Sequence, residues 1–150
     1  MTILYFSSTG NCLYLGKKLG GTLISIPRAL KEKQLQFSDE VIGIVCPCYY
    51  FGVPKLVERF LRSATIQCRY AFGIISYGNF SGGAVHHLWK KAGQSGLELS
   101  YVNEVLMLDN YVSLFDTEEQ IKKLPEKNIE ENITRIMSDI SARKTYRKQA

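Results

Sequence analysis

The chain of 150 residues is long enough for one domain with a buried core, and we expect a single domain over residues 1–150. Its 45% hydrophobic and 22% charged residues are typical of a globular protein, which disfavours a disordered or fibrous chain. The net charge of +5 arises largely from four basic residues in the last ten positions, and since no known binding motif accompanies them, we expect no nucleic-acid site.

Membrane and metal classes are also disfavoured. No apolar stretch approaches the roughly 20 residues needed to cross a bilayer, so we expect no membrane span. Met1 leads directly into an apolar run without the basic region of an export signal, and we therefore expect a cytoplasmic protein. The spacing of Cys12, Cys46, Cys48 and Cys68 matches neither a zinc nor an iron–sulfur pattern, which predicts free thiols and no metal site.

Apolar runs that predict strands alternate along the chain with amphipathic segments that predict helices. In chain order these are a strand at 2–6, a helix at 11–19, a strand at 22–26, a loop with up to one turn at 28–38, a strand at 40–46, a helix from Pro54, a strand at 70–77, a helix at 82–92, a strand within 97–108 and a helix from Thr117, interrupted or kinked at Pro125. This alternation predicts an α/β fold with a doubly wound, five-stranded parallel sheet. Ligands bind such sheets outside the carboxyl ends of the strands.

The first strand end carries five small or polar residues ahead of a helix: Ser7, Ser8, Thr9, Gly10 and Asn11. A helix start leaves backbone N–H groups unpaired and carries a partial positive charge, so it can seat a phosphate. The hydroxyls and the Asn11 amide add donors, and Gly10 permits close approach. The loop has no lysine, which excludes a Walker A loop. An ordinary helix cap needs only one such residue, so five favour a phosphate site.

Two further strand ends carry aromatic residues. The first loop reads PCYYFGVP and has three aromatic residues in succession, and the second reads SYGNFSGG. Exposed aromatic side chains are costly, so these residues either pack inward or cover a flat ligand. Because two such loops accompany a candidate phosphate site, we favour the second alternative, that the aromatic residues cover a flat ligand. The candidate residues are Pro47, Cys48, Tyr49, Tyr50, Phe51 and Gly52 in the first loop and Ser76, Tyr77, Gly78, Asn79, Phe80 and Gly83 in the second.

The strand TILYF, the hydroxyl-rich loop SSTGN and the two aromatic loops together resemble the flavodoxins and flavodoxin-like proteins. The sequence departs from that pattern at Cys12, where Thr is usual, and at Gly16, where Ala is usual. The resemblance covers nearly the whole chain. It is closest to flavodoxin domains that precede a ferredoxin-type domain, because YFSSTGN and MLDNY are similar there, but no iron–sulfur cysteines follow in this chain.

The resemblance implies the strand order 2-1-3-4-5 and FMN as the cofactor. It places the FMN phosphate at Ser7 to Cys12 and the flavin ring between the two aromatic loops. It implies an electron carrier that exchanges single electrons with a redox partner protein, either a ferredoxin-type protein or a reductase. No catalytic residue is expected, because the flavin carries the redox chemistry.

Two other functions stay open: an NAD(P)H-dependent FMN or quinone oxidoreductase of the same superfamily, and a binding module that keeps the fold without the cofactor. Asn110 and Tyr111 either approach the flavin or only turn the chain. His86 and His87 follow the third loop, and we expect them to be solvated or packing residues.

Overall fold

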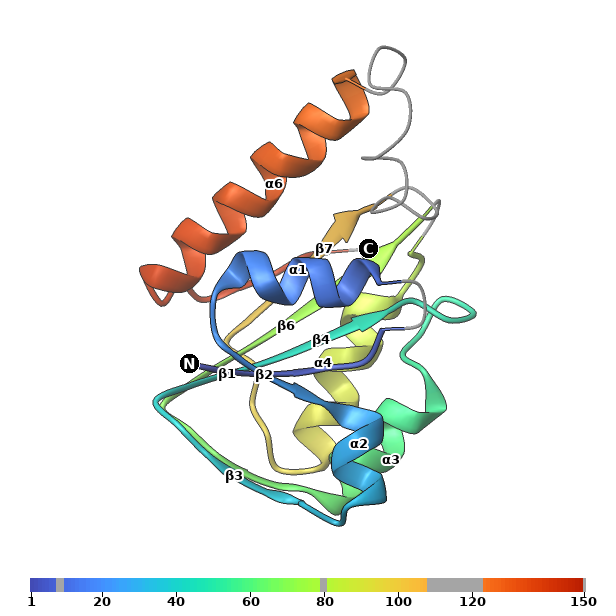
Figure 1. Ribbon diagram of the computed structural model, residues 1–150, viewed down its shortest axis with the longest axis vertical. Coiled ribbons are helices and arrows are strands. Elements are labelled where there is room, and N and C mark those ends of the chain that lie inside the picture. The colour runs from blue at the N-terminus through green and yellow to red at the C-terminus, as the bar shows by residue number, and fades with distance from the viewer. Residues whose placement is uncertain (8–9, 79–80, 108–122, 150) are drawn as a thin grey trace.

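A six-stranded parallel sheet forms the centre of the computed structural model, which describes residues 1–7, 10–78, 81–107 and 123–149 (Figure 1). The strands of this sheet lie in the order β2-β1-β4-β6-β7-β8, and every described pair of neighbouring strands is parallel. The strands are β1 (Thr2–Tyr5), β2 (Thr22–Ser25), β4 (Val41–Pro47), β6 (Tyr70–Tyr77), β7 (Tyr101–Leu106) and β8 (Tyr146–Arg147).

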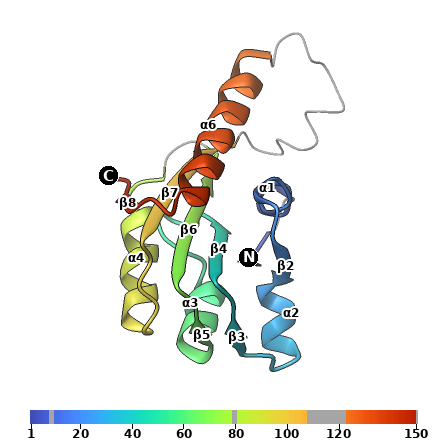
Figure 2. The same cartoon turned by 90° about the vertical axis from the view of Figure 1, so that its left-hand side faces the viewer.

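The first five of these are the five predicted strands, and they follow the predicted order 2-1-3-4-5, so the doubly wound α/β fold is confirmed. The sixth strand, β8, was not predicted. It pairs Tyr146 and Arg147 with Tyr101 and Val102 at the edge of the sheet, beside α4 (Ala84–Gln94) (Figure 2). A two-residue strand in a basic tail leaves no apolar run to detect.

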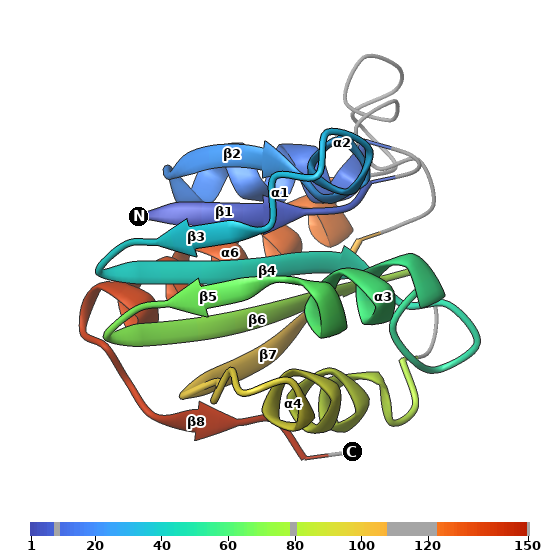
Figure 3. The same cartoon turned by 90° about the horizontal axis from the view of Figure 1, so that it is seen from below.

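Helices cover both faces of the sheet (Figure 3). One face carries α1 (Asn11–Leu19) and α6 (Lys123–Ser141), and the other carries α2 (Ile26–Lys31), α3 (Lys55–Ser63) and α4. Neighbouring strand residues alternate between the two cores: Ile3 packs with the first pair of helices and Leu4 with the other three. Of the helices described, none has the length and apolar character needed to span a membrane.

The predicted loop at 28–38 is wrong in part, because α2 and a short strand, β3 (Gln36–Ser38), occupy much of it. Ser25 caps α2 by accepting a hydrogen bond from the Arg28 N–H at 3.3 Å. The strand β3 pairs with β5 (Thr65–Gln67), and the resulting ribbon precedes β4 and β6 in the chain, away from their carboxyl ends.

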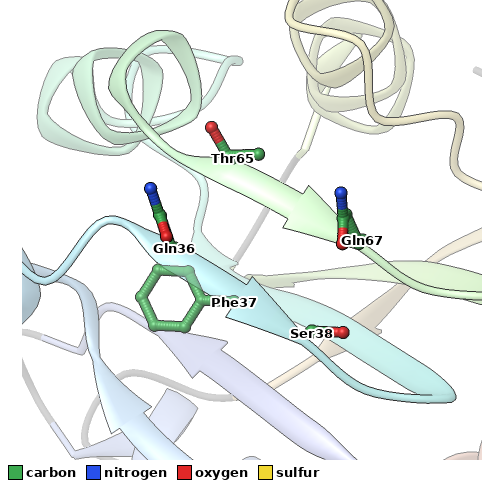
Figure 4. Close-up of a pocket in the computed structure, with 5 residues that line it drawn as sticks. All are labelled: Gln36, Phe37, Ser38, Thr65 and Gln67. Carbon is green, nitrogen blue, oxygen red and sulfur yellow. The ribbon is translucent and has the colours of Figure 1, made fainter.

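An open pocket of about 410 Å³ lies on this ribbon, which positions Gln36, Thr65 and Gln67 on one side (Figure 4). The Phe37 side chain is buried instead and packs against Phe60, with 5.7 Å between the ring centroids. This aromatic contact fastens the ribbon to α3.

The predicted interruption of the last helix is not found in its described part. The described helix runs through Pro125 without a break. Thr117, the predicted start of this helix, lies outside the described residues.

Candidate functional site

Residues 6–10, which we call the helix-start loop, connect the carboxyl end of β1 to the start of α1. Gly10 precedes the helix with a left-handed φ of 93°, and its N–H donates to Ser7 Oγ at 3.0 Å. The first helical hydrogen bond runs from the Tyr14 N–H to the Gly10 carbonyl at 2.9 Å, so the amides of residues 11–13 lie ahead of it. Among the described residues other than its chain neighbours, no atom lies within 4 Å of a Cβ placed on Gly10. The described part of the loop therefore combines a helix start with open space at Gly10, two features that an anion site requires.

The side chains that follow Gly10 turn into the protein. Asn11 and Cys12 are 7% and 2% exposed, and Cys12 belongs to the core cluster beneath α1. Burial raises the pKa of the Cys12 thiol to about 12, although a hydrogen bond with Ser76 lowers it in part. Cys12 therefore stays a neutral thiol inside the core, and only its backbone faces the loop. Ser8 and Thr9 lie outside the described residues.

The segment Tyr49–Gly52, which we call the aromatic hairpin, forms a two-residue turn after β4. The Tyr49 N–H donates to the Gly52 carbonyl at 2.8 Å, and the Gly52 N–H donates back to the Tyr49 carbonyl at 3.0 Å. Tyr50 and Phe51 between them have φ values of 52° and 63°. Positive φ at both central positions defines the type I′ class, which favours Asn and Gly. For Tyr and Phe this conformation costs about 1–2 kcal/mol each.

The aromatic hairpin is also exposed. Tyr49, Tyr50 and Phe51 are 38%, 101% and 58% exposed, so these side chains do not pack into the core. Backbone strain combined with exposed aromatic rings is typical of a ligand-binding loop, because neither feature stabilises the free protein.

The aromatic hairpin contacts both of the other strand-end loops at the carboxyl edge of the sheet. The Phe6 ring, next to Ser7, meets the Tyr49 ring edge to face, with 6.1 Å between centroids. Phe51 lies against Gly82, where an added Cβ would come within 2.9 Å of the Phe51 Cβ. The tertiary structure thus brings together the helix-start loop, the aromatic hairpin and the loop before α4.

Cys48 joins the first aromatic loop to the second. Its N–H donates to the Ser76 carbonyl at 2.9 Å, and its thiol Sγ lies 3.5 Å from the Ser81 carbonyl. Burial raises the pKa of the Cys48 thiol. The cysteine therefore acts as a neutral donor, and it holds the two loops at a fixed separation. Pro47, the residue before it, ends β4 in register with Ser76.

Glu104 of β7 lies beneath the second aromatic loop, and sequence reasoning did not identify it. The buried Ser81 hydroxyl donates to both carboxylate oxygens of Glu104, at 3.0 and 3.1 Å. Burial and the Glu104 carboxylate raise the pKa of Tyr77, which therefore remains a neutral phenol. Of the other predicted residues here, Gly78 follows β6 and Gly83 caps α4, whereas Asn79 and Phe80 lie outside the described residues.

Neither the scan against protein-family models nor the search of curated proteins finds a match to this chain. Solved structures do match. The chain resembles the two-electron reduced flavodoxin of Megasphaera elsdenii, with a TM-score of 0.53 at 16% identity over 83% of this chain and 95% of that one. A flavodoxin from the domain Archaea matches with a TM-score of 0.52 at 19% identity, over 75% and 89% of the two chains.

A flavoprotein from Lactobacillus acidophilus, solved in complex with FMN, matches with a TM-score of 0.51 at 15% identity, over 77% of this chain and 97% of that one. The chain has the flavodoxin-like fold. At these identities the likeness concerns the fold, and the side chains of the site rest on the contacts described above.

His87 of α4 contacts Val53, the residue that follows the aromatic hairpin. Its Nδ1 accepts a hydrogen bond from the Val53 N–H at 3.0 Å, and its Nε2 lies 3.7 Å from the Glu58 carboxylate of α3. Both histidines fit the expected solvated or packing role, and the hydrogen bond to Val53 is an additional feature of His87. His86 is exposed, and its ring lies tilted against the Trp89 ring, with 5.7 Å between the ring centroids. No local pattern distinguishes the two histidines, because the partner of His87 lies 34 positions away.

Proposed function

We propose that this protein binds FMN and transfers single electrons through it. The observation that carries the proposal is the contact between the helix-start loop, through Phe6, and the strained, exposed aromatic hairpin. The helix-start loop can hold a phosphate and the aromatic hairpin can cover a flat ring, so the two together suit a flavin mononucleotide. The likeness in fold to flavodoxins, and to a flavoprotein solved with FMN, supports the same assignment.

The described residues fit this cofactor. The phosphate would be held by the first amides of α1 beside Ser7 and Gly10, where the space is open. The ring would lie between the aromatic hairpin and the loop from Gly78 to Gly83. When bound, FMN supplies the redox chemistry, and the chain orients it and excludes water from it. Both backbone groups of Gly52 already bond Tyr49, so Gly78 is the better candidate for a backbone contact to the ring nitrogens.

An absorption spectrum with and without added FMN tests the binding. We expect the purified protein to bind FMN and to quench its fluorescence. Reductive titration of the complex is then expected to resolve two one-electron steps, because an electron carrier separates them. A protein that leaves FMN spectra unchanged contradicts the proposal. Steady-state oxidation of NAD(P)H with a quinone acceptor would assign the oxidoreductase function instead.

We further propose that the redox partner, a ferredoxin-type protein or a reductase, presents an acidic surface. The Arg147 guanidinium lies 4.0 Å from the centroid of the exposed Trp89 ring on α4, and the exposed Lys148 follows it. Neither cation forms an ion pair within the described part of the chain. Arg and Trp are the residues that most often dominate binding interfaces, and cations there select an acidic partner.

Salt dependence tests the charge of the partner. With a reduced acidic ferredoxin as electron donor, we expect the rate of FMN reduction to fall about tenfold or more as salt rises, because screening removes electrostatic steering. A charge-reversed Arg147→Glu and Lys148→Glu double variant should show a low rate at every salt concentration. A rate that salt and both substitutions leave unchanged contradicts an acidic partner docking here.

A further inference from the structure

We infer that His87 is a positioning residue whose neutral imidazole holds the aromatic hairpin in its strained conformation, and that protonation of His87 releases the hairpin. The inference concerns the protein without cofactor. Only its consequence for FMN, a weaker hold on the flavin ring at low pH, rests on the proposed function.

The contact requires one protonation state of the imidazole. Nδ1 accepts the Val53 N–H at 3.0 Å, and it can do so only when it carries a lone pair. The neutral ring then carries its proton on Nε2, which faces the Glu58 carboxylate at 3.7 Å. Val53 is 4% exposed, so loss of this acceptor would leave a buried N–H without its partner. The imidazole also fits closely, because a Cβ on Gly52 would lie 2.5 Å from Nδ1.

The hairpin depends on such outside support. Tyr50 and Phe51 occupy left-handed conformations that their side chains disfavour, and both rings are exposed. Strained backbone persists only where surrounding contacts hold it. Val53 directly follows the hairpin, and its hydrogen bond to His87 ties the end of the turn to a helix. Loss of that bond removes one of the contacts that hold the hairpin, two residues after the strained Phe51.

Two charged groups of the described residues face His87 or its partner. Glu58 of α3 approaches Nε2, and Lys91, one turn further along α4, lies 3.3 Å from the same Glu58 oxygen. Glu58 and Lys91 therefore form an ion pair beside the Nε2 side of the imidazole. On the hairpin side, a protonated Nδ1 would face the Val53 N–H, donor against donor. Protonation therefore strengthens the contact to Glu58 and breaks the contact to the hairpin.

Amide hydrogen exchange of the complete chain without flavin tests this inference. Between about pH 8 and about pH 5, where histidine changes its charge, the protection factor of the Val53 amide is expected to fall about tenfold. The protection factor is the intrinsic exchange rate divided by the measured rate at each pH, so the chemical pH dependence of exchange cancels. The Ile44 amide, in the central strand β4, should keep its protection over the same range.

Three substitutions separate positioning from simple packing. His87→Asn places Oδ1 where Nδ1 lies and does not titrate, so we expect protection of Val53 at both pH values. His87→Phe offers no acceptor and should give low protection at both. His86→Asn is the matched control on the neighbouring exposed histidine, and it should retain the wild-type pH dependence.

The inference is overturned if protection of Val53 does not change with pH in the wild type, or if His87→Asn keeps the wild-type pH dependence. These two proteins decide the question even if His87→Phe does not fold. FMN titrations of the same variants are read separately. A protein that shows the predicted exchange but binds no FMN refutes the proposed function and leaves the role of His87 standing.

Discussion

The Ser7→Asp variant is expected to bind FMN about a hundredfold more weakly than the wild type and to bind riboflavin with unchanged affinity. Ser7 Oγ accepts the Gly10 N–H at the entrance to α1, where we place the phosphate. An aspartate there sets a carboxylate against the phosphate dianion, and juxtaposed like charges cost several kcal/mol. Riboflavin has no phosphate and does not meet this repulsion.

The same substitution should leave the fold intact. An aspartate oxygen can accept the Gly10 N–H as the hydroxyl does, and a negative charge near a helix start stabilises the helix by about 0.5 kcal/mol. We therefore expect an unfolding midpoint equal to or slightly above that of the wild type. Ser7→Ala, which removes the acceptor without adding charge, is the control and should weaken FMN binding far less.

Flavin fluorescence titrations with both ligands measure the difference. Equal losses for FMN and riboflavin would mean that the substitution disturbs the ring site and not a phosphate seat. Unchanged FMN affinity would place the phosphate elsewhere and refute the role of the helix-start loop.

The Gly43→Ala variant is expected to lower the free energy of unfolding by about 2–3 kcal/mol. Gly43 pairs with Phe72 across β4 and β6, and the Phe72 ring lies over it. A Cβ on Gly43 would come within 2.1 Å of the Phe72 Cζ, and the Phe72 ring is completely buried. A close-packed core cannot shift to make that room without strain.

Urea denaturation of two further proteins tests the cause. Gly93→Ala is the same chemical change in α4, where an added Cβ meets nothing within 4 Å, and it should stabilise the protein by up to about 1 kcal/mol. Combining Gly43→Ala with Phe72→Leu should cost less than the two single effects together, because the smaller side chain makes room for the methyl group. Strict additivity, or a Gly43→Ala variant as stable as the wild type, contradicts this contact.

The main strands and the helix α1 could be predicted from the sequence because each has a characteristic pattern of apolar residues within its own segment. Residues 2–6 and 40–46 are continuous apolar runs, and the leucines of 11–19 recur at helical spacing. The candidate loops were found for the same reason, since each follows such a run. The predictions for Ser8, Thr9, Asn79 and Phe80, and for Asn110 and Tyr111, fall outside the described residues and remain predictions.

Other features arise from contacts between distant parts of the chain. The strand β3 forms because Phe37 pairs with Ile66 of β5, and β8 forms because Tyr146 pairs with Tyr101 of β7. The left-handed turn at Tyr50 and the Val53 bond to His87 likewise have no local signature. The apolar pattern of a strand or helix extends over a few neighbouring residues, so it can be recognised in the sequence. Strand pairing, backbone strain and the choice between two adjacent histidines depend on which distant segments meet, and the folded chain settles them.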